Sequence, residues 1–164
     1  KVKWPSDPEL QVYLEQLATF DALYRDPRGR TVSVAYMGLT QLSETCDEGV
    51  RWQAVADIAK GDLPFDHHDI LHTALTRLQG KLRYTNIDRT LVPETFRIED
   101  LQIVYEAILS RPVNRTNFRT KLLKIGLIDQ VSVLSDAVGS QGGRPPHVYR
   151  FTQDSIEAVN RDFL

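Results

Sequence analysis

Two helix-like patterns separated by three residues constrain this chain more than any other feature. Apolar residues recur at helical spacing through residues 99–109 and again through residues 113–128, and Ser-Arg-Pro at 110–112 breaks the helix between them. We expect Asn114 to be the N-cap of the second helix and Gly126 to be its C-cap. The apolar stripe of the second helix consists of Phe118, Leu122 and Ile125.

The sequence after these helices predicts a β-hairpin. LIDQVSVL (127–134) and HVYRF (147–151) are strand-like, and the segment between them holds three glycines and two prolines. Helix, turn, helix and hairpin follow in the order of a winged helix, whose second helix lies in the DNA major groove. The last segment, TQDSIEAVNRDFL (152–164), predicts a short amphipathic helix.

Positive charge is concentrated in this region, although the whole chain has a formal net charge of -2. Residues 111–150 contain seven basic side chains but only two acidic ones, Asp129 and Asp136. Glycines beside arginine let backbone approach phosphate, so we predict DNA binding. The alternative is a helix that packs through its apolar face and leaves its basic side solvated. The predicted DNA-binding residues are Asn114, Arg115, Thr116, Asn117, Arg119, Lys121 and Lys124, with Arg144 at the hairpin tip.

The first half of the chain predicts strands followed by one helix. Residues 11–20 alternate, with the even-numbered positions expected on one side, and residues 31–39 form a second strand-like run. VRWQAV (50–55) predicts a third, short strand. Asp66 is expected to cap a helix with apolar residues from Ile70 to Leu82.

The loop between the first two strands is a candidate ligand site. Guanidinium groups bind phosphate in paired fashion, and this loop contains Arg25, Asp26, Arg28 and Arg30. The alternative is a turn centred on Asp26 with solvated arginines.

Other side chains are given structural interpretations. His68 and His72 lie four residues apart beside His67, but no third ligand has useful spacing, so we predict no metal site. Cys46 lacks a nearby basic partner and is expected to be inert. Trp52 and Tyr36 are expected in the core; the alternative is stacking on adenine.

Several motifs together resemble a known family. LQIVYEAILSRPVNRTNFRTKLLKIGLI, followed by GGRPPHVYRF, resembles the C-terminal domain of the NrtR family, the Nudix-related transcriptional regulators of NAD metabolism. YLEQLATF, RDPRGRTVSVAY, VRWQAV and LPFDHHDILHTALTRLQGKLRYT are similar to the later part of that family's Nudix-type sensor domain. The resemblance implies an α+β chain: a partial Nudix-like α/β sensor domain in residues 1–88, its N-terminal part missing, and a winged helix-turn-helix domain in residues 89–164.

The resemblance also implies a function. Regulators of this family are dimeric repressors that bind a palindromic operator and release it when ADP-ribose occupies the sensor, which implies control of NAD biosynthesis genes. The charged loop around Arg28 would then lie near the ligand or dimer surface. No segment matches the glutamate-rich Nudix box that holds magnesium in hydrolases, so we expect no enzymatic activity. The alternatives are a Nudix hydrolase of ADP-ribose and an arabinose-type sugar-responsive regulator of the same architecture.

Composition limits the cellular setting. No apolar run approaches the roughly 20 residues of a membrane helix, and the first residues lack the pattern of a signal peptide. The single cysteine is compatible with a reducing compartment. We therefore expect a soluble cytoplasmic protein.

Overall fold

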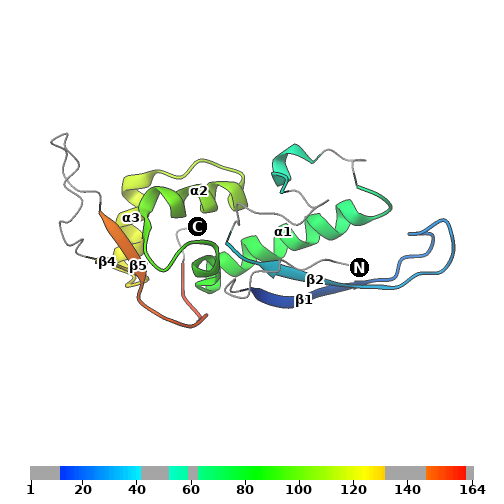
Figure 1. Cartoon of the computed structure of the whole chain (residues 1–164), viewed down its shortest axis with the longest axis horizontal. Helices are drawn as coiled ribbons and strands as arrows, with labels where there is room; N and C mark the ends of the chain where they lie inside the picture. Colours follow the sequence, from blue (N-terminus) through cyan, green and yellow to red (C-terminus); the bar gives the residue numbers. More distant parts are fainter. Residues whose placement is uncertain (1–11, 42–51, 59–62, 132–146, 162–164) are drawn as a thin grey trace. The chain divides into compact units, whose positions relative to one another are not determined.

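The computed structural model describes residues 12–41, 52–58, 63–131 and 147–161. The chain divides into two compact units, Lys1–Leu78 and Gln79–Leu164, which are treated separately below (Figure 1). Both units mix helices and strands, so the predicted α+β class is confirmed.

Unit 1 contains an antiparallel hairpin of β1, Tyr13–Phe20, and β2, Ser33–Leu39, which confirms both predicted strands. A β-bulge after Gln16 shifts the register of the pair. Because a bulge inserts one residue, the buried side changes within β1: Leu17 is buried, whereas Leu14 is exposed. The expected single-sided alternation is therefore wrong over the first half of this strand.

Residues 52–58 do not form the predicted third strand. Residues 52–54 have no regular structure, and η1, Val55–Asp57, is one turn of 3-10 helix. The Asp57 N–H donates to the Ala54 carbonyl (3.0 Å), so a backbone donor that a strand would offer to a neighbour is bonded locally. The strand prediction is wrong over its described residues, and residues 50–51 lie outside them.

Helix α1, His67–Tyr84, confirms the predicted helix; it begins in unit 1 and ends in unit 2. The Asp66 carbonyl accepts hydrogen bonds from the N–H groups of Asp69 (2.9 Å) and Ile70 (3.2 Å), which starts the helical ladder. Within the described part of the chain, every helix is too short or too polar to span a membrane.

Unit 2 has the predicted order of paired helices and hairpin. Strand β5 lies between β3 and β4 and is antiparallel to both. The paired helices and both hairpin strands are confirmed, whereas the hairpin tip, residues 132–146, lies outside the described residues. The elements are η2 (Ile87–Leu91), β3 (Phe96–Arg97), α2 (Ile98–Leu109), α3 (Arg115–Lys124), β4 (Ile128–Val131) and β5 (Val148–Phe151).

The core of unit 2 joins the two helices to the sheet. The ring of Tyr105 on α2 meets the ring of Phe118 on α3 edge-on, with the ring centroids 4.6 Å apart. Ile128 of β4 and Tyr149 of β5 are also buried. Burial of these apolar side chains stabilises the paired helices against the hairpin.

The segment after β5 is not the predicted amphipathic helix. Its backbone instead bonds to the end of α1 and the residues that follow: the Val159 N–H donates to the Tyr84 carbonyl (2.8 Å), and the Asn86 N–H donates to the Glu157 carbonyl (3.1 Å). These tertiary bonds satisfy backbone groups that a helix would have paired internally. Residues 162–164 lie outside the described part.

This tail carries a buried charge into the core. Arg161 forms an ion pair with Asp88 of η2 (Nη2 to Oδ1, 2.7 Å), and both side chains are fully buried. The Tyr105 hydroxyl donates to Asp88 (2.8 Å) and accepts from Arg161. Burial, and then the charge of Asp88, raise the pKa of Tyr105 well above its ordinary value, so its hydroxyl stays protonated.

Breaking this buried pair should strongly destabilise unit 2. Asp88→Asn leaves the guanidinium of Arg161 buried without a counter-charge, and we expect a loss of about 3–5 kcal/mol in the free energy of unfolding, measured by urea denaturation. The double variant with Arg161→Met removes both charges and should recover part of that loss. Equal stability of the single variant and the unmodified chain would contradict this role.

Candidate functional site

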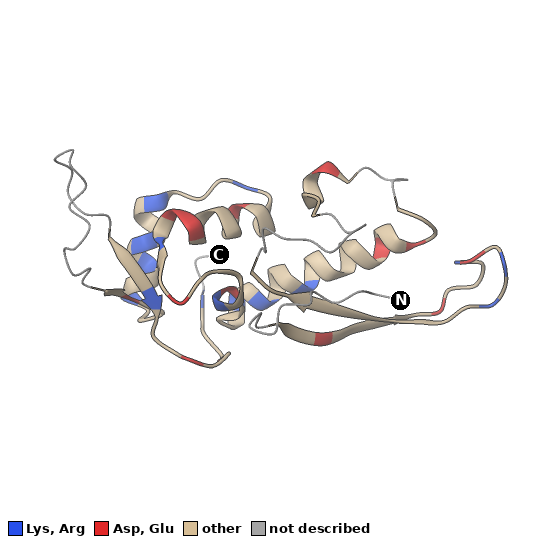
Figure 2. Ribbon diagram, viewed as in Figure 1, with Lys and Arg blue, Asp and Glu red and all other residues tan. Residues whose placement is uncertain are grey.

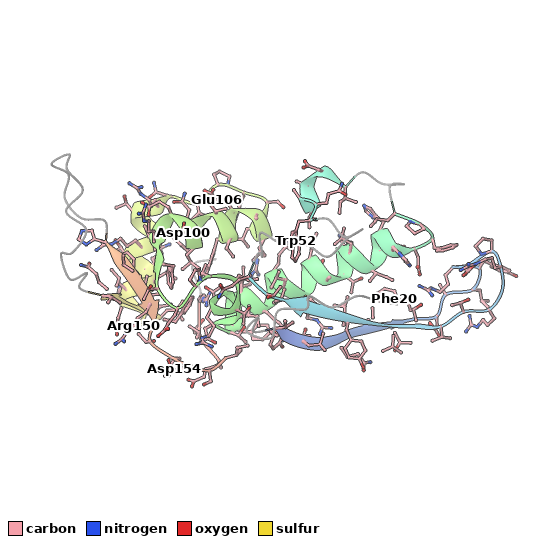
Figure 3. All side chains as sticks on the ribbon, viewed as in Figure 1. Phe20, Trp52, Asp100, Glu106, Arg150 and Asp154 are labelled. Carbon is pink, nitrogen blue, oxygen red and sulfur yellow. The ribbon has the colours of Figure 1, made fainter. Side chains whose placement is uncertain are left out.

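Helix α3 is oriented by a hydrogen-bonded turn that precedes it. Ser110 ends α2 in the left-handed conformation (φ 52°). The Glu106 carboxylate on α2 (Figure 3) then accepts from the Val113 N–H (2.8 Å) and from the Gln102 amide (3.0 Å). The Val113 N–H, followed by Gln102, lowers the pKa of Glu106 and keeps it an acceptor. The angle between the helices is thereby set by side chains of α2.

Both ends of α3 are capped by local chemistry. The Asn114 side chain accepts from the Asn117 N–H (3.0 Å), which confirms the predicted N-cap. At the other end Ile125 is the capping residue, and Gly126 follows it with φ 66°. The N–H of Gly126 bonds to Leu123, and that of Leu127 bonds to Leu122 (both 3.0 Å), a Schellman motif. The predicted C-cap at Gly126 is therefore off by one residue, because Ile125 is the C-cap and Gly126 is the left-handed residue after it.

The exposed side of α3 is defined by the side that it buries. Phe118 and Leu122 are buried, and at 100° per residue the opposite side of the helix carries Thr116, Asn117, Thr120 and Lys124. We call these four exposed residues the outer surface of α3. The helix has three basic residues in addition to Lys124 and no acidic residue (Figure 2). Thr120 was not among the predicted residues, although its spacing from Thr116 placed it on the same side.

Two predicted DNA-binding arginines lie outside this surface and are held by protein partners. Arg115 forms an exposed ion pair with Glu99 of α2 (2.6 Å). Arg119 is half-buried, and its Nε donates to the Tyr149 hydroxyl (2.5 Å). Lys121 is exposed on the flank of the helix, and Arg144 lies outside the described residues. The two arginines are therefore directed to different partners, not held together as a pair.

The arginine loop of unit 1 is also largely paired. Arg25 forms a bidentate ion pair with Asp66 (Nε to Oδ2 and Nη2 to Oδ1, both 2.7 Å), and its Nη1 donates to Ser33 (2.6 Å). The side chain of Arg25 is only 5% exposed. The carboxylate predicted to cap α1 therefore binds this arginine, and Arg25 keeps few donors for a ligand.

Of the remaining loop residues, Asp26 is buried, whereas Arg28 and Arg30 are accessible. Asp26 accepts from the backbone N–H of Arg28 (2.9 Å) and from its guanidinium (2.7 Å), and Arg30 donates to the Asp21 carbonyl (2.6 Å). The side chains of Arg28 and Arg30 are nevertheless 75% and 54% exposed. The guanidinium of Arg28 also lies 5.0 Å from the ring centroid of Phe65. Phe65, like exposed Tyr24, has a left-handed backbone, and such strain is frequent at functional sites.

The other side chains singled out in the sequence lie as follows. Trp52 (Figure 3) and Tyr36 are more than half exposed, so their expected core positions are wrong. Tyr36 falls on the exposed side of β2, which alternates with buried Met37. Among the described residues, which include His67, His68 and His72, no group of three His, Cys, Asp or Glu side chains is placed to hold a metal ion. Cys46 lies outside the described residues.

Comparisons with known proteins identify the type of the winged-helix domain. Residues 89–151 match the NrtR DNA-binding winged helix domain. An ADPR responsive transcriptional repressor, NtrR of Acinetobacter baylyi, is 36% identical over 144 residues, which cover 85% of this chain and 56% of that relative. Residues 89–151 therefore form a winged-helix domain of the NrtR type, and 85% of the chain is similar to that repressor.

Solved structures agree with this assignment. Shewanella oneidensis NrtR, alone and complexed with a 27mer DNA, is 29% and 28% identical, with a TM-score of 0.62 in each case. Each match covers 85% of this chain and 64% of the NrtR chain. A MutT/nudix family protein from Enterococcus faecalis shares the fold at 19% identity and a TM-score of 0.57, over 85% of this chain and 62% of its own. The chain thus spans 56–64% of the length of these relatives.

The pair between Arg115 and Glu99 should weaken DNA binding. Glu99→Gln removes a negative charge beside the first residue of α3 and frees the guanidinium of Arg115 for phosphate, so we expect affinity for duplex DNA to rise about twofold to fivefold. Fluorescence anisotropy at fixed salt measures the change. Glu94→Gln is the matched control, because exposed Glu94 forms no ion pair with α3. An equal gain in DNA affinity in both variants would show that the effect comes from net charge and not from the ion pair.

The arginine loop should lose carboxylate charge only at low pH. Hydrogen bonding to Arg25 lowers the pKa of Asp66, and Arg28 lowers the pKa of Asp26 to about 2. A carboxylate with a lowered folded-state pKa stabilises the fold above its ordinary value near 4, and this contribution disappears as the pH falls through the lowered value. We therefore expect unit 1 to lose this stabilisation between about pH 4 and pH 2.

NMR titration of carboxyl carbons tests the pairing. In Arg25→Gln the pKa of Asp66 should rise toward its ordinary value, whereas Asp26, whose main partner is Arg28, should change less. An unchanged pKa for Asp66 would contradict the pairing.

Proposed function

We propose that this chain is part of a transcriptional repressor that binds an operator through unit 2 and responds to a ligand through unit 1. Three findings support the proposal: the match of residues 89–151 to the NrtR winged helix domain, 36% identity to a repressor named as ADPR responsive, and likeness to an NrtR solved with DNA. We assign sensing to residues 1–88 and DNA binding to residues 89–164, a boundary ten residues beyond the start of unit 2.

The outer surface of α3 is the observation that carries the DNA-binding proposal. Thr116, Asn117 and Thr120 expose short hydrogen-bonding side chains that suit base edges, and Lys124 adds a charge that suits phosphate. No acidic residue of α3 opposes them. The positive end of the helix dipole lies at the start of α3 and also favours phosphate. Arg119 and Lys121 flank this surface, Arg115 is exposed at the start of the helix, and Arg144 belongs to the proposed hairpin contact.

A homodimer would explain recognition of a palindrome. Two copies of α3 related by a two-fold axis would meet half-sites about 34 Å apart, or a multiple of that distance. The operator would then repeat one short sequence in inverted orientation. A repressor acts where the chromosome is, so the proposed location is the cytoplasm.

The proposed effector is ADP-ribose or a related nucleotide. Arg28 and Arg30 expose guanidinium groups that suit a pyrophosphate, whereas Arg25 is committed to Asp66. An effector shifts a conformational equilibrium only by its difference in affinity between two states. ADP-ribose must therefore bind more tightly to the conformation that does not fit the operator.

Capture of fragmented genomic DNA by the intact protein tests this function. The bound fragments are sequenced after washing with buffer, with ADP-ribose or with arabinose, and release of AMP from ADP-ribose is measured in parallel. We expect a palindrome near NAD biosynthesis genes that only ADP-ribose releases, with no magnesium-dependent hydrolysis.

The other outcomes separate the rival functions. Release by arabinose would assign a sugar effector to the same repressor. Hydrolysis without enrichment of any sequence would assign a hydrolase and overturn the proposal.

Two substitutions on α3 should have different effects. Asn117→Ala should reduce the preference for operator over scrambled duplex by about 1–3 kcal/mol, because a side-chain amide reads a base edge. Lys124→Ala should weaken both duplexes equally and lower the slope of log affinity against log salt by about one, as for a phosphate contact. Anisotropy titrations at several salt concentrations measure both quantities. Unchanged binding in both variants would exclude the outer surface as the interface.

A further inference from the structure

A buried tyrosine of the hairpin holds one arginine of α3 in place. Tyr149 lies on β5, the central strand of the sheet, and is 1% exposed. Its hydroxyl accepts a hydrogen bond from Nε of Arg119 (2.5 Å), and the guanidinium carbon lies 5.6 Å from the ring centroid. The packed sheet fixes the ring, so the orientation of the guanidinium is fixed as well.

This contact leaves the terminal nitrogens of Arg119 available. A guanidinium has five N–H donors, and Tyr149 occupies the one on Nε. Within the described residues the structure gives Nη1 and Nη2 no further hydrogen bond or ion pair. Because the tyrosine is neutral, the full positive charge remains for an incoming anion. The two terminal nitrogens form the fork that matches two oxygens of a phosphate.

The position of Arg119 on α3 favours phosphate over a base. Its half-buried side chain lies between the buried side, with Phe118 and Leu122, and the outer surface, with Thr116 and Thr120. When the outer surface of a recognition helix enters the major groove, the flanks lie nearest the sugar-phosphate strands that wall the groove.

We propose that Tyr149 is a positioning residue that holds Arg119 for a contact with a DNA backbone phosphate. The inference rests on the proposed DNA-binding function and adds to it the residue and chemical group that organise one contact. Tyr149 itself touches no DNA. Its effect passes entirely through the guanidinium.

A double-mutant cycle on the full chain tests the inference. The variants Tyr149→Phe, Arg119→Gln and their combination are titrated by anisotropy against the captured operator and a mixed-sequence duplex. Tyr149→Phe should weaken binding to both duplexes about threefold to tenfold, the usual range for one lost hydrogen bond. It should leave the salt slope unchanged, because the charge stays, whereas Arg119→Gln should lower the slope by about one. In the Arg119→Gln background, Tyr149→Phe should have no further effect.

A matched control separates positioning from general damage to the fold. Arg150 is the next residue of β5 and is exposed (Figure 3), so its side chain lies on the opposite face of the strand from buried Tyr149. Because the two side chains share no partner among the described residues, Tyr149→Phe and Arg150→Gln should have additive effects. Thermal unfolding of each variant confirms that the titrated protein is folded.

The remaining outcomes overturn either the inference or the function beneath it. If Tyr149→Phe weakens binding equally with and without Arg119, or not at all, Tyr149 does not act through the guanidinium. A loss confined to the operator would place Arg119 on a base and overturn the phosphate contact. If the unmodified chain binds neither duplex, the proposed function fails and this inference fails with it.

Discussion

The side chain of Tyr105 is the point on which the winged-helix unit depends. Its ring packs on Phe118 of α3, and its hydroxyl joins Asp88 of η2 to Arg161 of the tail. Three segments far apart in sequence are thereby attached to one residue of α2. An isolated helix of ten residues is marginal in water, so α3 owes its stability to this packing more than to its own propensity. The surface that α3 presents therefore follows from what α2 and the tail bury.

Orientation matters more for this unit than the mere presence of a basic helix. A shift of α3 by one residue would turn it by 100° and exchange Phe118 for a polar neighbour in the core. The N-cap at Asn114, the left-handed Gly126 and the buried pair of Phe118 and Leu122 all specify the same rotation. Agreement of local and tertiary signals is what makes one arrangement unique. The same rotation leaves Asn117 exposed on the opposite side.

The features that depend on short sequence separation could be predicted. Helical spacing, the cap at Asn114 and the glycine at 126 predicted α3, and strand-like apolar runs predicted β1, β2, β4 and β5. The helix predicted for the tail was wrong because the partner of Arg161 is Asp88, which lies 73 positions away in the sequence. Without knowledge of that partner, a lone arginine in an amphipathic pattern indicates a solvated helix face. The partners of the arginines on α3 were missed for the same reason. Charge in a sequence gives the number of cations but not the groups that they bind.

The chemical groups that bind the arginines of a helix decide how much positive charge that helix presents. A carboxylate that pairs with an arginine both orients it and cancels its charge, as Glu99 does for Arg115. A tyrosine hydroxyl orients the guanidinium but cancels nothing, as at Arg119. The attraction of a protein surface for a polyanion depends on the net charge of that surface. A directed contact is stronger when the side chain loses less conformational freedom on binding. A buried neutral acceptor meets both requirements. It restrains the arginine side chain before the anion binds, and it leaves the full charge of the guanidinium available to the anion.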